Sequence, residues 1–283
     1  MPETLKDWDL IIKPKNRLFD LKLKRVWKYR DLLWLLVRRD FIAFYKQTVL
    51  GPLWFLIQPI FIVGVYVFLF GTVARISTGE IPMPLFYLSG ILTWTYFSET
   101  LLKTSSVFRD NIQIFSKVYF PRLIMPLSIL FSNLLRFFAQ LLLFSLLLIY
   151  YKIKGFNITI GFHIFLFPFA LILLAMLALG FGLMVSALTT KYRDFAMLVT
   201  FSISIFMYAC PVVYPIEALP ALAQKIVKLN PLTQIIQLVR FSFFNSVSID
   251  WTYVLFSVLI SILVLLSGLI IFNRVEKNFI DTI

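Results

Sequence analysis

The sequence predicts an all-α polytopic membrane protein with six transmembrane helices, an N-terminal amphipathic interfacial helix, and a re-entrant helical hairpin between the fifth and sixth spans. Hydrophobic residues make up 60% of the 283 residues and charged residues only 14%, which leaves too little polar surface for a soluble fold. Six apolar stretches each reach about 20 residues, the length that crosses a ~30 Å hydrocarbon core. In addition, 12 of the 27 Lys and Arg residues precede the first of these stretches.

The N-terminal segment, residues 1–49, is expected to stay in the cytoplasm. It is rich in charge and lacks the apolar core and small-residue cleavage site of a secretory signal, so we expect it to be retained. Residues 28–47 resemble a helix lying on the inner membrane surface, because five of their seven charged residues share an arc of roughly 100°, while Arg30 and Asp40 lie on the apolar side. That arc holds Lys28, Asp31, Arg38, Arg39 and Lys46. Two interpretations stay open: a plain amphipathic anchor, or recognition of lipid phosphate by the arginines.

The six spans make up a transmembrane domain over residues 50–273. We place them at Leu50–Val73, Leu85–Phe108, Pro126–Tyr150, Phe162–Thr189, Phe195–Tyr214 and Trp251–Phe272.

The distribution of basic residues fixes the orientation. With the N-terminus inside, the cytoplasmic segments hold 19 Lys and Arg residues and the external segments hold 6, in agreement with the positive-inside rule. Six crossings return the chain to the cytoplasm, so residues 274–283 form a cytoplasmic tail. The basic charge (net +13) flanks apolar spans and therefore indicates orientation and anionic lipid contact, and no nucleic acid.

The longest external segment, residues 215–249, is apolar for a loop. We expect it to dip back into the membrane as two short helices, with Pro231 in the first turn of the second helix and Asn230 as its cap. Non-helical backbone at membrane depth is tolerated only against protein or a water-filled cavity, so this hairpin is expected to border a pathway.

The sequence contains no catalytic or metal site that we recognise. The only cysteine is Cys210 and the only histidine is His163, and we interpret them as a buried hydrophobe and an interfacial residue. No G-x-x-x-x-G-K-[ST] loop is present to hold nucleotide phosphates. We therefore expect no enzyme activity and no bound cofactor in this chain; if ATP drives this protein, another chain must hydrolyse it.

Charged residues within the predicted spans are Glu99, Lys103 and Arg136. They are too few to suggest coupling to protons or sodium. Glu99 and Lys103 are spaced i, i+4 on the second span, which favours a mutual ion pair. The alternative is that they line an aqueous cavity or meet a symmetry-related copy.

Aromatic residues make up 17% of the chain, and Tyr87, Trp94 and Phe97 lie along one side of the second span. Interfacial belts and lipid contact explain most such rings in membrane proteins. The alternative is that these three line a conduit, because the apolar faces of sugar rings pack on aromatic side chains without demanding tight geometry.

The order of local motifs resembles the permease subunits of ATP-binding-cassette polysaccharide exporters of the O-antigen, teichoic-acid and capsule type. The resemblance runs from about Leu33 to Val275. The motifs that carry it are R-R-D-F-I-A-F-Y-K-Q-T-V-L-G-P-L-W (38–54), Y-L-S-G-I-L-T-W-T-Y-F-S-E-T-L (87–101), V-Y-F-P-R-L-I-M-P-L-S (118–128), Y-R-D-F (192–195), P-V-V-Y-P (211–215) and N-P-L-T-Q-I-I-Q-L-V-R (230–240).

This resemblance implies a homodimer in the bacterial inner (plasma) membrane, joined by two copies of a soluble nucleotide-binding ATPase. The cargo would be a glycan on a polyprenyl pyrophosphate. The cytoplasmic loop 109–125 would dock the ATPase through a coupling helix, although it could also be a simple connecting loop. The implied coupling residues are Asn111, Ile112, Gln113, Phe115, Lys117 and Tyr119.

The remaining implied sites follow the path of the cargo. Arg38, Arg39 and Lys46 would attract the pyrophosphate where the lipid enters. Tyr87, Trp94 and Phe97 would give the sugars a weak track through the membrane. The outer gate would lie within residues 216–245 and include Asn230, Pro231 and Arg240.

Other functions stay open at this point. A six-span permease could instead export a small lipophilic compound, or act alone as a flippase or enzyme on a lipid-linked sugar. A stand-alone enzyme should show a carboxylate pair or a cluster of His, Asp and Glu near the interface, and we find none. A structural membrane anchor would leave the polar residues within the spans unexplained.

Overall fold

The computed structural model describes residues 23–46, 48–156, 158, 161–192, 194–244 and 246–278. The predictions for residues 1–22 and 279–283, for Gln47 and for Asn245 lie outside this part. Every regular element within it is helical, and no strand is present there. The predicted all-α class is therefore confirmed.

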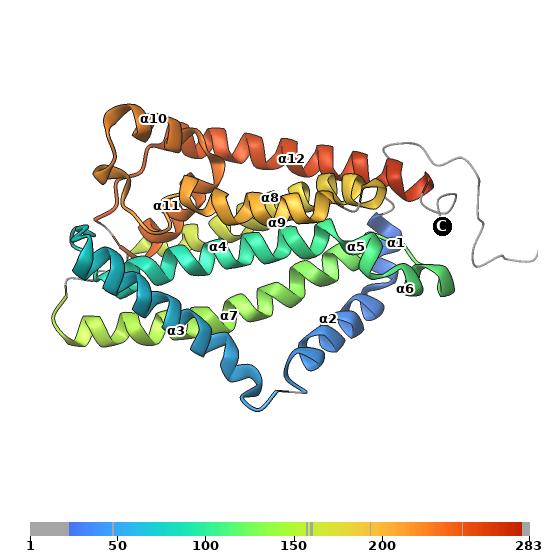
Figure 1. Ribbon diagram of the computed structural model, residues 1–283, viewed down its shortest axis with the longest axis horizontal. Coiled ribbons are helices and arrows are strands. Elements are labelled where there is room, and N and C mark those ends of the chain that lie inside the picture. Colours follow the sequence, from blue (N-terminus) through green and yellow to red (C-terminus); the bar gives the residue numbers. More distant parts are fainter. Residues whose placement is uncertain are drawn as a thin grey trace, which may run out of the picture.

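The helices follow one another through short connections (Figure 1). In chain order they are α1 (Leu23–Lys28), α2 (Arg30–Tyr45), η1 (Gly51–Leu53), α3 (Trp54–Tyr66), η2 (Val67–Val73), α4 (Met83–Ser105), α5 (Val107–Asp110), α6 (Ile112–Lys117), α7 (Ile124–Ile153), η3 (Phe162–Phe165), α8 (Leu166–Lys191), α9 (Phe195–Phe206), η4 (Met207–Ala209), η5 (Ile216–Ala218), α10 (Ala221–Leu229), α11 (Pro231–Phe243) and α12 (Trp251–Asn278).

Four helical stretches of the described residues are long and apolar enough to cross a membrane: Gly51–Val73, Ile124–Ile153, Phe162–Lys191 and Trp251–Val275. They correspond to the first, third, fourth and sixth predicted spans. The second predicted span corresponds to α4, which has 23 residues but carries more polar side chains.

The fifth predicted span is shorter than expected. The sequence predicts a span over Phe195–Tyr214, but the apolar helix covers only Phe195–Ala209. Proline lacks a backbone N–H and disfavours helical geometry in the residue before it. Accordingly Cys210, which precedes Pro211, is extended with φ −116° and ψ 149°.

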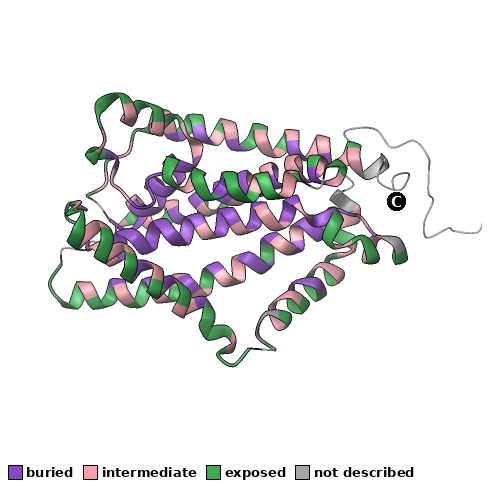
Figure 2. Ribbon diagram, in the orientation of Figure 1, coloured by how far each residue is buried: buried purple, intermediate pink, exposed green. Residues whose placement is uncertain are grey.

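Helix α4 lies at the centre of the bundle. It packs against α7, α8, α11 and α3, and most of its residues are buried, as Figure 2 shows. Helices α3 and α9 turn largely exposed apolar surfaces outward (Figure 2), including Phe61 and Phe201 at 71% and 66% exposure. Such faces are typical of helices that contact lipid or another chain.

Among the described helices, α8 and α12 have the most extensive contact with each other. A Cβ atom built at Gly268 would lie 2.4 Å from the carbonyl oxygen of Gly180, and one built at Gly180 would lie 2.8 Å from the backbone of Val264. Small residues at such positions let two helix backbones approach closely, as is common in membranes.

The two ends of the bundle carry different elements (Figure 1). Helices α5 and α6 lie at one end, with α1 and the last turns of α12; we call this the α6 end. Helix α10 and the start of α12 lie at the opposite end, which we call the α10 end. Sites predicted for the cytoplasmic and external sides are thus separated by the length of the bundle.

Candidate functional site

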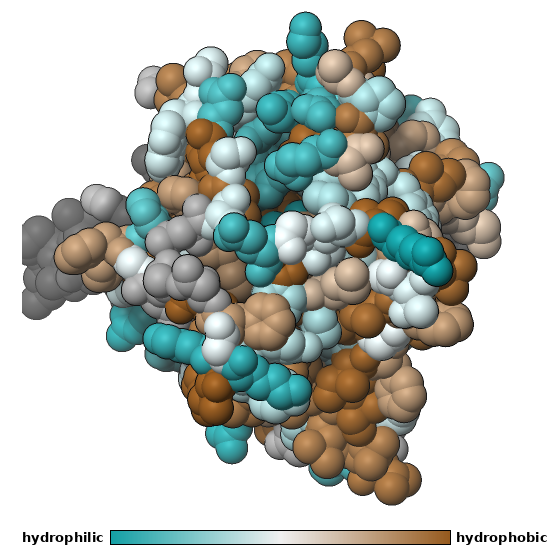
Figure 3. Space-filling model, turned by 90° about the vertical axis from the view of Figure 1, so that its left-hand side faces the viewer, coloured by the Kyte–Doolittle hydropathy of each residue, from teal (hydrophilic) through white to brown (hydrophobic). Residues whose placement is uncertain are grey.

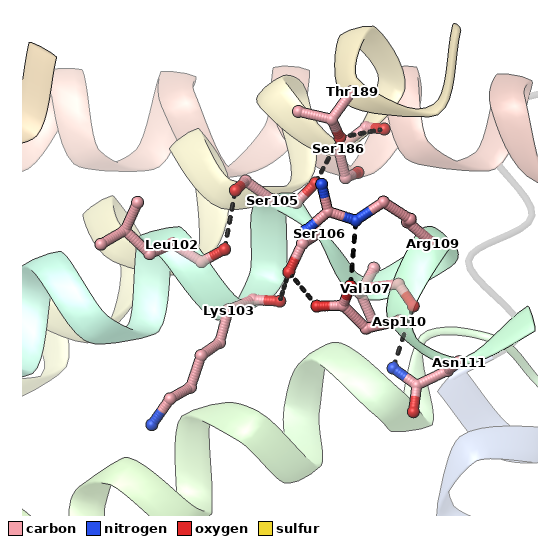
Figure 4. Close-up of polar contacts among 10 residues, drawn as sticks. All are labelled: Leu102, Lys103, Ser105, Ser106, Val107, Arg109, Asp110, Asn111, Ser186 and Thr189. Atoms are coloured by element: carbon pink, nitrogen blue, oxygen red, sulfur yellow. Dashed lines mark hydrogen bonds and ion pairs between the residues drawn. The ribbon is translucent and has the colours of Figure 1, made fainter. Parts of the chain in front are cut away.

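The α6 end is shaped by two turns that follow α4. Ser106 (φ −101°, ψ 6°) and Asn111 (φ −118°, ψ 19°) leave helical geometry and separate α4, α5 and α6. Local side chains hold the turns (Figure 4): Arg109 Nε donates to Asp110 Oδ1 at 3.0 Å, and Asn111 Nδ2 donates to the carbonyl oxygen of Val107 at 2.9 Å. The hydroxyl of Ser106 donates to the same Asp110 carboxylate.

Helix α6 is attached to the bundle through aromatic rings. Phe115 packs between Phe108 and Phe120, with ring centres 5.9 and 5.7 Å away. Phe108 is buried in turn and stacks on Phe272 of α12 at 4.8 Å. Packed rings therefore connect α6 to α12, and close-packed interiors of this kind transmit strain.

The outward side of this element is exposed. Of the predicted coupling residues, Asn111 and Phe115 are half-buried, while Ile112, Gln113, Lys117 and Tyr119 are exposed. Tyr119 is 60% exposed and the preceding Val118 is 56% exposed. Apolar, polar and basic groups thus share one projecting surface, which is suitable for a protein contact.

A hydrogen bond fastens α8 to α4 beside these turns. The hydroxyl of Thr189 donates to the carbonyl oxygen of Ser105, at the last residue of α4 (Figure 4). Thr189 is only 4% exposed. This bond joins the ends of α4 and α8 next to α6, and the sequence did not predict it because it links residues 84 positions apart.

A charged network joins α4 to α7. Glu99 accepts from Lys103 Nζ and from Arg136 Nη1, both at 2.9 Å, which confirms the i, i+4 pair predicted from the spacing and adds a second cation. Lys103 also donates to Asn133 Oδ1 at 3.1 Å. The Arg136 guanidinium lies 5.4 Å from the centre of the Phe55 ring on α3. Ionisable groups on membrane helices pair in this way because isolated charges there are costly.

The three aromatic residues proposed for the glycan track are buried within the single chain. Tyr87, Trp94 and Phe97 are 0%, 7% and 2% exposed and belong to the main core. Tyr87 contacts the rings of Tyr66 and Phe86 at 6.1 and 5.6 Å, while Trp94 and Phe97 lie 5.9 Å apart. Their role along a pathway stays a prediction, and it requires the helices around α4 to separate.

The basic residues proposed for lipid phosphate lie on α2 and its C-terminal end. Arg38, Arg39 and Lys46 are all exposed. Arg39 forms a two-point contact with Asp40 Oδ1, at 3.0 Å from Nε and 2.8 Å from Nη2. Helix α2 is anchored on its other side by the buried side chain of Val37.

The predicted outer-gate residues lie near the α10 end. Asn230 caps α11 as expected: its Oδ1 accepts from the backbone N–H of Leu232 at 3.0 Å, and Pro231 occupies the first turn. The Asn230 amide also donates to Cys210 Sγ at 3.3 Å. Arg240 is 1% exposed, so it belongs to the interior of this region.

Arg240 ties α11 to two other parts of the chain. Its Nε donates to Ser89 Oγ at 3.3 Å, and its Nη2 donates to the carbonyl oxygen of Val212 at 3.1 Å. The guanidinium lies 3.6 Å from the centre of the Phe86 ring, a favourable cation–π contact. A side chain at Gly90 would collide with Val212 and Arg240, at 2.7 and 3.0 Å.

Three sequence motifs therefore meet at one point: residues 87–90 of α4, residues 211–215 and residues 230–240. The Arg240 Nη1 atom is buried with no hydrogen-bond partner in the described part of the chain. Buried cations with incomplete hydrogen bonding are expensive and are typical of functional positions. The described residues contain no group of three or more His, Cys, Asp and Glu side chains that could hold a metal ion.

Comparison with known proteins identifies the family. Residues 31–244 match the family of ABC-2 type transporters. The chain belongs to the ABC-2 type transporter family. Its relatives include the O-antigen export system permease protein RfbA of Klebsiella pneumoniae, 27% identical over 89% of this chain and 94% of the relative. RfbA of Myxococcus xanthus is 27% identical over 92% of this chain and 98% of its own length.

Membership in the ABC-2 family confirms the resemblance deduced from the motifs. It makes this chain a multi-pass membrane transport subunit that is not itself catalytic, and it implies an ABC ATPase partner. The matched region begins in α2 and ends just after α11. It therefore includes the α2 cations, the α6 surface and the Arg240 contacts.

Proposed function

We propose that this chain is the permease subunit of an ATP-driven exporter that moves a polyprenyl-pyrophosphate-linked polysaccharide, such as O-antigen, across the bacterial inner membrane. The observation that carries the proposal is the extent of the likeness. Relatives named as O-antigen export permeases match about nine-tenths of this chain and 94–98% of their own length. Because the similarity extends from one end of the bundle to the other, it supports a common transport function and not merely one common structural element.

In this proposal the chain crosses the membrane six times with both termini in the cytoplasm. Helix α4 and the segment Phe195–Ala209 complete the set of spans, and α10 and α11 form the re-entrant hairpin. Trp34 and Leu35 of α2 are each 62% exposed, which is compatible with α2 lying at the inner interface. Because the chain has one cysteine, cysteines added singly to a Cys210→Ser background can be labelled from either side to test this orientation.

Two copies of the chain would form the pathway and two ATPase subunits would drive it. The outward apolar faces of α3 and α9 supply surface for the second copy. ATP binding must favour one arrangement of the pair, which requires a mechanical contact with the ATPase. We assign that contact to residues 111–119, because their exposed side is linked through Phe115 and Phe108 to α12. ATP and Mg would be bound by the partner alone.

The lipid pyrophosphate would enter at the exposed cations of α2, Arg38, Arg39 and Lys46, because arginine suits phosphate recognition. Replacing Arg38 and Arg39 together by Gln should reduce export while leaving membrane insertion intact. Arg30→Gln is the matched control, since Arg30 is exposed on the same helix and pairs only loosely with Asp31 at 3.9 Å. Normal export by the double variant at matched protein level would remove this role.

The proposed function is tested in cells from which the chain has been deleted. Total polysaccharide and surface-exposed polysaccharide are measured separately, and the deleted chain is then restored. We expect lipid-linked polysaccharide to accumulate inside the deletion cells and to reach the surface again after restoration. Unchanged surface polysaccharide in the deletion cells would refute the proposal.

A further inference from the structure

A polar cavity of about 680 Å³ lies at the α10 end. It is bounded by η5, α10, α11 and the start of α12, and its size is within the usual range for ligand sites, about 300–1,000 Å³. Figure 3 looks onto this end of the bundle and shows hydrophilic side chains gathered in the upper half of the face. The residues used below are Glu217, Gln224, Lys228, Gln237, Asp250 and Trp251.

Gln237 lines this cavity without a protein partner. Its side chain is 9% exposed, and no hydrogen bond to its amide is found among the described residues. Its amide atoms are not among the buried side-chain atoms that lack a partner, so they reach the open space of the cavity, where water or a ligand can form hydrogen bonds with them. Gln224, in contrast, donates to the carbonyl oxygen of Leu219 at 2.9 Å. The free amide of Gln237 is therefore available to a ligand.

The charges of the lining favour an uncharged ligand. Glu217 and Asp250 carry two negative charges and Lys228 carries one positive charge. Arg240 lies one turn beyond Gln237 on α11, where it is buried and does not line the cavity. Including its positive charge would only bring the net charge of the site to zero. A phosphate or pyrophosphate would meet no net positive charge here, whereas binding such anions normally requires one.

The chemistry of the lining matches a hydroxyl-rich molecule. An amide both donates and accepts, and a carboxylate accepts, so together they suit neighbouring hydroxyl groups. Trp251 is 57% exposed and offers an apolar surface to one face of a sugar ring. Asp250 also caps α12, because its Oδ1 accepts from the backbone N–H of Thr252 at 3.0 Å, so this side of the site is held in place.

We propose that this cavity binds a short uncharged segment of a glycan, with Gln237 and the carboxylates on its hydroxyl groups and Trp251 against a ring face. The proposal rests on the proposed function, which supplies a glycan at this end of the bundle. Binding here would hold the emerging polymer between steps of export. A weak site suits that task, because a polymer that must move on cannot be held tightly.

The test uses the whole transporter, permease and ATPase together, in lipid nanodiscs. The probe is the surface polysaccharide of the source cells, released from its lipid by mild acid, with inorganic pyrophosphate as a second probe. Gln237→Met keeps the side-chain volume but removes the amide. Gln140→Met is the matched control, since Gln140 is also 9% exposed but lies on α7 away from the cavity.

We expect Gln237→Met to weaken polysaccharide binding about three- to tenfold, the loss of one or two hydrogen bonds. Trp251→Ala should also weaken it, Gln140→Met should change it less than about twofold, and pyrophosphate should not compete. Normal binding by both Gln237→Met and Trp251→Ala would overturn the proposal, as would competition by pyrophosphate.

A second measurement does not depend on the Gln237 variant folding. Ser248 is exposed and lines the same cavity, so Ser248→Cys in a Cys210→Ser background can be labelled with a bulky maleimide. Labelling should abolish polysaccharide binding, and unchanged binding would overturn the proposal. If the wild-type chain exports polysaccharide but none binds at this cavity, only the proposed glycan site is refuted. If the wild-type chain does not export polysaccharide, the proposed function itself is refuted.

Discussion

Replacing Gly268 by alanine tests the tight crossing of α8 and α12. The new Cβ would lie 2.4 Å from the Gly180 carbonyl oxygen, about 1 Å short of the 3.4 Å at which ordinary contacts begin. Because that oxygen belongs to the backbone, the two helices must separate. Overpacking of this kind costs about 1–3 kcal/mol, whereas the better helix propensity of alanine returns about 1 kcal/mol. Because the contact is far under 3.0 Å and is with backbone, we expect the upper part of the overpacking range, about 2–3 kcal/mol, which leaves a net loss of about 1–2 kcal/mol.

The assay is thermal unfolding of the purified protein in mild detergent, followed by the loss of the monodisperse peak in size-exclusion chromatography. A loss of about 1–2 kcal/mol corresponds to a midpoint lower by about 2–8 °C. Gly64→Ala is the matched control, because no atom lies within 4 Å of its added Cβ; its midpoint should equal or exceed that of the wild type. A Gly268→Ala midpoint equal to that of the wild type would refute the close crossing.

Three further predictions concern the polar sites. Glu99→Gln leaves two cations without their carboxylate, and because the site is only partly buried we expect the stability measured by thermal unfolding to fall by about 1–3 kcal/mol. The exposed control Glu80→Gln should leave the stability unchanged. An equal effect of both variants would contradict a stabilising role for the charged network. Asn230→Ala removes the α11 cap and should cost about 1 kcal/mol in the same assay, largely recovered by Asn230→Ser; an equally low midpoint for the serine variant would argue against capping. Ile112→Asp should release the ATPase from the purified complex without unfolding the chain, whereas the control Leu222→Asp at the α10 end should retain it. If both variants retain the ATPase, the docking surface does not include Ile112.

Much of the helical layout is predictable from local sequence. Apolar length alone located the four membrane-length helices within a few residues. The junction of α10 and α11 followed from Asn230 and Pro231, because capping and the restrictions of proline are local effects. The same local rule explains why the fifth helix is shorter than its apolar sequence: the apolar residues continue beyond Ala209, but Pro211 ends the helix early.

The parts that local sequence did not reveal depend on contacts between distant residues. The Glu99–Lys103 pair follows from helical spacing, but Arg136 reaches Glu99 from 37 residues away. An aromatic face was predicted on α4, yet helical periodicity does not indicate that neighbours cover the helix on nearly every side. The meeting of residues 87–90 with Val212 and Arg240 is likewise a tertiary result, although each segment belongs to a motif that the sequence singled out.

The most direct test of the central claim, that this chain is the permease subunit of an ATP-driven exporter, is its composition when isolated from native membranes. The tagged chain would be purified in mild detergent, and its stoichiometric partners would be identified by mass spectrometry. The account predicts one soluble ATPase at equal copy number with the chain. Absence of every ATPase, under conditions that preserve other membrane complexes, would contradict it.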